Sequence, residues 1–173
     1  MKKMISRRSF LAAAGVSAAA LALTACGGSS SSTAASAAGS TAAASGDTIK
    51  VGVMGPMTGD VSVYGLAVTN GANLYLDQVN ANGGINGKMI ESITMDEQGD
   101  ATQAVQCFTK MVDEGIVGLI GDVTTTPTLA VAAESQDYNM PMVTASATAE
   151  AVTYDAETDT VYENVFRATF TDP

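Results

Sequence analysis

Hydrophobic residues from about position 49 onward fall into short apolar runs, separated by longer stretches in which they recur every three or four positions. The first run, IKVGVM over 49–54, is rich in β-branched residues and stops at Gly55 and Pro56, which predicts a buried strand followed by a sharp loop. Further strands are predicted over 89–96, 116–120, 142–145 and 165–170. Helical spacing over 65–80 and 101–112 predicts amphipathic helices between the first three strands.

The predicted helices have recognisable faces and ends. The first helix is expected to turn one apolar stripe toward the sheet, formed by Val68, Ala72, Tyr75, Leu76 and Val79. A third helix is expected to begin at Pro127, where a missing N–H needs no partner, with Thr126 as its cap and an end near Tyr138. Residues 150–164 are acidic and show no pattern of a long element.

Repeated strand–helix units predict an α/β fold with a doubly wound parallel sheet and right-handed crossovers. In such sheets a ligand binds beyond the carboxyl ends of the strands, where the strand order reverses. Three loops are expected at that edge, over residues 55–64, 121–126 and 144–148, and all three are rich in hydroxyl groups and glycine. The sequence therefore predicts that these loops converge on one site.

The chemistry of these loops suits a carboxylate. They offer hydroxyl groups, and one of them opens a helix whose first N–H groups carry partial positive charge. Such donors bind an anion without burying a full countercharge. The alternative, which the residues alone leave open, is that Thr126 only caps the helix and the other hydroxyls face water.

The first 46 residues have a different organisation. A basic start, an apolar run over 10–23 and a cysteine at position 26 form the three-part layout of an export signal, and the run is too short to span a bilayer comfortably. Residues 27–46 are almost wholly Gly, Ser, Ala and Thr, which predicts a flexible linker. The expected organisation is thus a signal over 1–26, a linker over 27–46 and a folded part over 47–173.

Composition argues against several classes of partner and activity. The chain carries 18 acidic and 8 basic residues, and a surface of that sign repels nucleic acid. It has no histidine, and Cys107 lies alone in a predicted helix, where we expect a half-buried structural thiol. Asp96, Glu97 and Asp100 lack calcium-loop spacing and are expected to cap the following helix. No catalytic residue, metal site or cofactor is predicted.

A set of short segments, ordered along the chain, carries a family resemblance. They are IKVG at 49–52, TG at 58–59, YG at 64–65, NGGING at 82–87, Asp96, QAV at 103–105, IG at 120–121, MV at 142–143, AT at 147–148 and FR at 166–167. On these segments the chain resembles the first lobe of the leucine/isoleucine/valine-binding protein family of type I periplasmic binding proteins. Members of that family are substrate receptors of ABC importers for branched-chain amino acids and are not enzymes.

The resemblance implies a role for four residues. Thr125 falls where the family has a serine or threonine that donates to the ligand carboxylate through its hydroxyl and N–H groups. Ser146 falls where a backbone carbonyl accepts from the ligand ammonium group, and Thr148 where a threonine contacts the same head group. Tyr64 falls at an aromatic position that lines the side-chain pocket.

The N-terminal segment also carries two resemblances. Residues 23–26, LTAC, look like a bacterial lipobox, which implies diacylation of Cys26 and an extracytoplasmic protein anchored to the cell membrane. Residues 6–11, SRRSFL, resemble a twin-arginine signal, and export by either the Sec or the twin-arginine route stays open. The implied partners are a small amino acid, the lipid anchor and membrane permease subunits.

The family pattern differs from this chain in two ways. Gly99 and Thr124 occupy the positions of a disulfide-bonded cysteine pair in many members, so that bridge is absent here. Members also have a second lobe, and we expect this chain to be an N-terminal fragment with half a cleft and little or no affinity by itself. The expected function is substrate binding for an importer of branched-chain or related amino acids. A ligand-sensing domain of the same fold, feeding a membrane receptor, is the alternative.

Overall fold

The computed structural model describes residues 48–173 of the chain. The predicted export signal over 1–26, with Cys26, and the linker over 27–46 lie outside the described residues and stay predictions. No helix within residues 48–173 is both long enough and apolar enough to cross a membrane.

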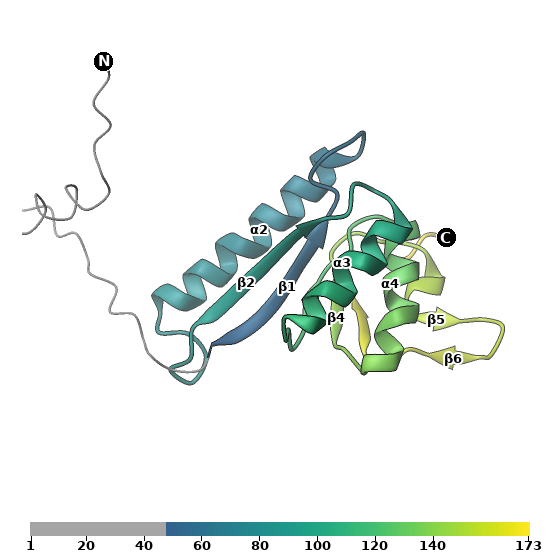
Figure 1. Ribbon diagram of the computed structural model, residues 1–173. Helices are drawn as coiled ribbons and strands as arrows, with labels where there is room; N and C mark the ends of the chain where they lie inside the picture. The colour runs from purple at the N-terminus through teal and green to yellow at the C-terminus, as the bar shows by residue number, and fades with distance from the viewer. Residues whose placement is uncertain (1–47) are drawn as a thin grey trace, which may run out of the picture. The chain divides into compact units, whose positions relative to one another are not determined.

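The centre of the fold is a five-stranded parallel sheet (Figure 1). The strands lie in the order β2-β1-β3-β4-β7, so the order reverses between β1 and β3, next to the middle of the sheet. This confirms the predicted doubly wound parallel sheet. The strand bounds are β1 (Ile49–Gly55), β2 (Ile90–Asp96), β3 (Leu119–Ile120), β4 (Met142–Thr144) and β7 (Val165–Arg167).

The region predicted to lack a long element indeed has only short ones. A single 3-10 turn, η1 (Glu150–Val152), precedes a small antiparallel hairpin of β5 (Tyr154–Asp155) and β6 (Thr160–Val161). This hairpin projects beside α4 and does not join the main sheet (Figure 1).

Three helices cover the two faces of the sheet, namely α2 (Ser62–Ala81), α3 (Ala101–Asp113) and α4 (Thr125–Tyr138) (Figure 1). Adjacent residues of β1 point to opposite faces, as a strand requires. Val53 packs with Leu76 of α2, whereas Met54 joins the core beneath α3 and α4. The alternation at the end of β1 therefore places one helix on one face and two on the other.

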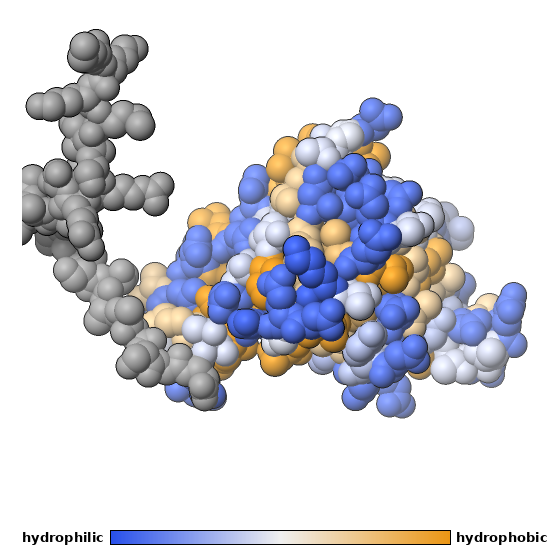
Figure 2. Space-filling view, viewed as in Figure 1, coloured by the Kyte–Doolittle hydropathy of each residue, from blue (hydrophilic) through white to orange (hydrophobic). Residues whose placement is uncertain are grey.

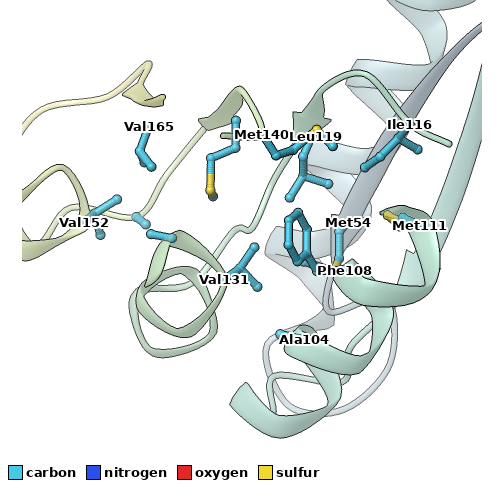
Figure 3. Packing of buried hydrophobic residues seen from close by; sticks show 13 residues of the cluster. Met54, Ala104, Phe108, Met111, Ile116, Leu119, Val131, Met140, Val152 and Val165 are labelled. Carbon is cyan, nitrogen blue, oxygen red and sulfur yellow. The ribbon is translucent and has the colours of Figure 1, made fainter. Parts of the chain in front are cut away.

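The larger core lies beneath α3 and α4. Phe108 of α3 is completely buried and lies beside Met54 at the centre of this cluster (Figure 3). Its ring meets that of Tyr138 of α4 edge to face, with the ring centroids 5.8 Å apart. Such side chains each contribute about 1.5–3 kcal/mol by burial, so this cluster holds the two helices against the sheet.

The predicted stripe of α2 is wrong at one position. Tyr75 is 66% exposed, and the buried polar residue Thr69 takes part in the face instead. The helix begins at Ser62 rather than at 65, and its inner face runs through Gly65, Thr69, Ala72, Leu76 and Val79. Thr69 is tolerated there because its hydroxyl donates to the Gly65 carbonyl oxygen, 2.9 Å away.

The start of α4 also differs from the prediction. The helix begins at Thr125, its cap residue is Thr124, and Pro127 is the third helical residue rather than the first. Proline fits at that position as well, because no residue in the first turn has a helical acceptor for its N–H group. By contrast, Asp100 caps α3 as expected, since its carboxylate accepts from Gln103 N at 2.8 Å.

Gly65 lets α2 cross closely over the loop that follows β1. A β-carbon at this position would lie 1.9 Å from the Pro56 carbonyl oxygen, which is an impossible contact. On the same helix, Gly71 is exposed and has no atom within 4 Å of the place that a β-carbon would take.

We expect Gly65→Ala to lower the free energy of unfolding by about 2–4 kcal/mol, because α2 must move away from Pro56. Gly71→Ala is the matched control and should raise the free energy of unfolding by about 0.5–1 kcal/mol through helix propensity. Urea unfolding followed by circular dichroism measures both. Equal effects of the two substitutions would contradict the close approach.

Candidate functional site

A hollow of about 290 Å³ lies at the carboxyl edge of the sheet, where the strand order reverses. Its lining comes from the three predicted loops and contains no charged side chain: Tyr64, Val123, Thr124, Thr125 and Ser146. A larger hollow, of about 350 Å³, lies between β2 and α3 near Cys107. We place the candidate site at the first, because ligands of doubly wound sheets bind at the reversal of strand order.

The first turn of α4 supplies donors to this hollow. The N–H groups of Thr125 and Thr126 have no helical acceptor, and the helix dipole places partial positive charge there. The hydroxyls of Thr124 and Thr125 make no hydrogen bond to any residue of 48–173. These groups are therefore free to donate to an anion in the hollow.

The loops after β3 and β4 are joined by side-chain hydroxyls. Ser146 Oγ donates to the Val123 carbonyl oxygen at 2.7 Å, and Thr144 Oγ1 donates to the Asp122 carbonyl oxygen at 2.6 Å. Thr144 Oγ1 also accepts from Ala147 N at 3.1 Å. The Ser146 hydroxyl is thus engaged in holding the loops together, which leaves its backbone for any contact with a ligand.

Three of the four predicted ligand-binding residues lie together, and one does not. Tyr64, Thr125 and Ser146 all line the hollow, whereas Thr148 is not part of its lining. Thr148 Oγ1 donates to Asp172 Oδ2 at 2.6 Å, and its carbonyl oxygen accepts from Arg167 at 3.0 Å. The four roles in ligand binding stay predictions.

Asp96 fixes the first of the three loops. One of its oxygens accepts from Met57 N at 2.8 Å and from Gln98 N at 3.0 Å, and the other accepts from the Thr58 hydroxyl at 2.6 Å. Burial raises the pKa of Asp96, but the hydrogen bonds from Thr58, Met57 and Gln98 outweigh it and hold the pKa below its usual value. Asp96 therefore stays ionised. It was expected to cap the following helix, but it holds the loop after β1 instead, and Asp100 caps α3.

Glu97 and Asp122 form a buried acidic pair that the sequence analysis missed. Both side chains are fully buried, and burial raises the pKa of Asp122 to about 8, with a further rise from the charge of Glu97. Burial also raises the pKa of Glu97. Nothing in the local pattern revealed the pair, because its members follow different strands and are 25 positions apart.

Metal and thiol chemistry find little support in the described part of the chain. Residues 48–173 contain no group of three or more His, Cys, Asp or Glu side chains that could hold a metal ion. Cys107 is half-buried, and its thiol donates to the Asp96 carbonyl oxygen at 3.7 Å. Burial raises the pKa of this thiol, and the nearby charge of Glu97 raises it further, as expected for a structural residue.

Comparison with known proteins identifies the family. The family model described as "Periplasmic binding protein" matches residues 48–173. The chain belongs to this family. It is 36% identical over 107 residues to the leucine-, isoleucine-, valine-, threonine- and alanine-binding protein of Pseudomonas aeruginosa, covering 62% of this chain and 29% of that protein. The predicted resemblance to leucine/isoleucine/valine-binding proteins is confirmed.

Solved structures of this periplasmic binding protein family share the fold. The branched-chain amino acid transporter substrate binding protein of Streptococcus pneumoniae, in complex with isoleucine, matches with a TM-score of 0.66 and 30% identity over 72% of this chain and 34% of its own. A solute binding protein of Rhodopseudomonas palustris, in complex with 3,4-dihydroxy benzoic acid, matches with a TM-score of 0.61 and 25% identity. The match covers 72% of this chain and 32% of that protein. These relatives are substrate-binding proteins, not enzymes, which agrees with the sequence prediction. The chain spans about a third of their length.

We expect Thr144→Val to lower the free energy of unfolding by about 2–4 kcal/mol, because the Asp122 carbonyl and the Ala147 N–H lose their buried partner. Thr109→Val on α3 is the matched control, since the Thr109 hydroxyl only supplements a helical carbonyl at 2.8 Å. Its effect should stay within about 0.5 kcal/mol. Chemical unfolding measures both, and equal losses would show that the Thr144 contacts are unimportant.

Proposed function

We propose that this chain is part of an extracytoplasmic substrate-binding component of an ABC importer for branched-chain or related amino acids. The observation that carries the proposal is the uncharged, donor-rich hollow at the reversal of strand order in a periplasmic binding protein fold. Membership of a periplasmic family supports a location outside the cytoplasm.

The ligand carboxylate would lie at the start of α4. There it would accept from the Thr125 hydroxyl and from the free N–H groups of the first helical turn. The Ser146 carbonyl would accept from the ligand ammonium group. Thr148 lies outside the lining of the hollow, and its hydroxyl would have to leave Asp172 to contact the same head group. Tyr64, which is 62% exposed at the mouth of the hollow, would cover the ligand side chain.

The choice of ligand would depend largely on the rest of the protein. Two relatives of known structure are complexes with isoleucine and with 3,4-dihydroxy benzoic acid, which share a carboxylate and little else. The part of those proteins that this chain matches is about a third of their length. We infer that this part binds the carboxylate end and that residues elsewhere select the side chain.

We expect Thr125→Val to weaken leucine binding by about 10- to 100-fold, because a hydrogen bond to a charged group contributes about 1.5–3 kcal/mol. The experiment is isothermal titration calorimetry on the natural protein in which this chain occurs. Thr126→Val is the matched control, since Thr126 is exposed and does not line the hollow. Leucine, isoleucine, valine and 4-hydroxybenzoate should be compared.

Two results of that experiment would count against the proposal. Equal affinities for leucine in the Thr125 and Thr126 variants would remove Thr125 from the site. Tight binding of 4-hydroxybenzoate, with none of the three amino acids bound, would retain the carboxylate site but refute the amino-acid assignment.

We further propose that Cys26 carries a lipid anchor and that residues 27–46 tether the folded part to the membrane beside permease subunits. Cys26→Ser should abolish incorporation of labelled fatty acid and move the protein from the membrane to the soluble fraction. Cys107→Ser, at a half-buried thiol within the fold, is the control and should change neither. Retention of both label and membrane attachment in the Cys26 variant would refute the anchor.

A further inference from the structure

Glu97 and Asp122 form a buried pair next to the candidate ligand site, since Asp122 directly precedes Val123 in the lining of the hollow. Neither side chain has exposed surface, and the two carboxyl groups are within hydrogen-bonding reach of each other. Glu97 follows β2 and Asp122 follows β3, while β1 lies between these strands in the sheet. The contact therefore joins two loops that the strand ladder leaves apart.

Backbone donors satisfy only half of each carboxyl group. Gly99 N donates to Glu97 Oε2, and Val123 N donates to Asp122 Oδ1. No donor in residues 48–173 reaches Glu97 Oε1 or Asp122 Oδ2, which are both buried. Two ionised carboxylates would leave these oxygens unpaired and repelling each other, whereas one proton makes one of them a donor to the other.

The surroundings also oppose a second negative charge. The other titratable groups near the pair are Asp96 at the end of β2, Asp100 three residues after Glu97 and Cys107 on α3, with Lys110 about one turn further along α3. Segments 54–58, 124–131 and 144–149, at the adjoining ends of β1, α4 and β4, contain no titratable side chain. Apart from the pair itself, the charge that acts on Glu97 is that of Asp96, and it is negative.

We propose that Glu97 and Asp122 share one proton and act as positioning residues for the ligand site, so that ligand affinity falls when this proton is lost at alkaline pH. This inference rests on the function proposed above for the site. The Asp122 carbonyl accepts from Thr144, and the next carbonyl, of Val123, accepts from Ser146. Loss of the proton pushes Asp122 away from Glu97 and adds negative charge behind the donors, and both effects disfavour a bound carboxylate.

The shared proton is tested directly by carbon-13 NMR of the Asp and Glu carboxyl groups in the full chain. One resonance should titrate far above the usual acidic range, and it should disappear in both Asp122→Asn and Glu97→Gln. Each amide can donate to the remaining carboxylate, so both variants retain the hydrogen bond. Asp137→Asn, at an exposed position of α4, is the control and should leave the resonance unchanged. If every carboxyl group titrates in the acidic range, the shared proton is refuted.

The positioning role needs a readout at the site itself. The backbone amide resonances of Val123, Thr124 and Thr125 should shift with the pH midpoint of the pair in the wild-type chain, and these shifts should vanish in Asp122→Asn. If these amide resonances do not shift as the pair titrates, the positioning role is overturned, even where the shared proton is observed. This measurement needs no ligand.

Ligand affinity completes the test in the natural protein in which this chain occurs, with leucine as the probe. Between pH 6 and pH 8.5 the affinity should fall about fivefold or more in the wild type, a modest coupling between two sites. The fall in affinity should be clearly smaller in Asp122→Asn. Any effect of the titration of leucine itself is the same for the wild type and the variant, so it cancels in the comparison. Equal falls would refute the coupling. Absence of leucine binding at both pH values would refute the proposed ligand. The two NMR measurements would still show whether Glu97 and Asp122 share a proton and whether its loss alters the site.

Discussion

Side-chain hydrogen bonds at the carboxyl edge of the sheet hold the loops that form the candidate site. Asp96 holds the loop after β1, Thr144 and Ser146 hold the loop after β4 against the loop after β3, and the proposed shared proton would join Glu97 to Asp122 between the ends of β2 and β3. Strand pairing alone holds these loops weakly, because β3 pairs with each neighbouring strand over only two residues. The geometry of the hollow therefore depends on these polar contacts more than on the sheet itself.

These contacts would also explain how a strongly acidic chain offers the proposed site for an anion. The chain carries a net charge of -10, and hydrophilic side chains cover much of the face shown in Figure 2, with smaller hydrophobic areas between them. At the site, however, the lining is uncharged. Asp96 is surrounded by three N–H groups and a hydroxyl, which compensate its charge, and a shared proton would halve the charge of the buried pair. Free N–H groups at the start of α4 add partial positive charge at the hollow.

Hydrophobic periodicity predicted most of the fold because each strand and helix buries one continuous face. It failed where a polar residue could be buried at no cost, as with Thr69, whose hydroxyl bonds within its own helix while Tyr75 remains in solvent. The start of α4 was misplaced for another reason. The prediction put Pro127 first in the helix, but proline fits anywhere in a first helical turn. The convergence of the three loops was predictable from the rule for doubly wound sheets. The Glu97–Asp122 contact was not, because it depends on strand order, which a single sequence does not reveal.

The same arrangement favours binding and release over chemistry. The hollow presents hydroxyl and N–H groups, and its lining contains no carboxylate, imidazole, amine or thiol that could act as a general base. The acids closest to it are unsuited to that role, because Asp122 is sealed from solvent and Asp96 already accepts four hydrogen bonds. What remains is a set of donors whose positions are fixed before a ligand arrives, so that little conformational entropy is lost on binding. Under the proposed function, such rigidity would suit a receptor that passes its ligand on unchanged, and a reactive group would add nothing.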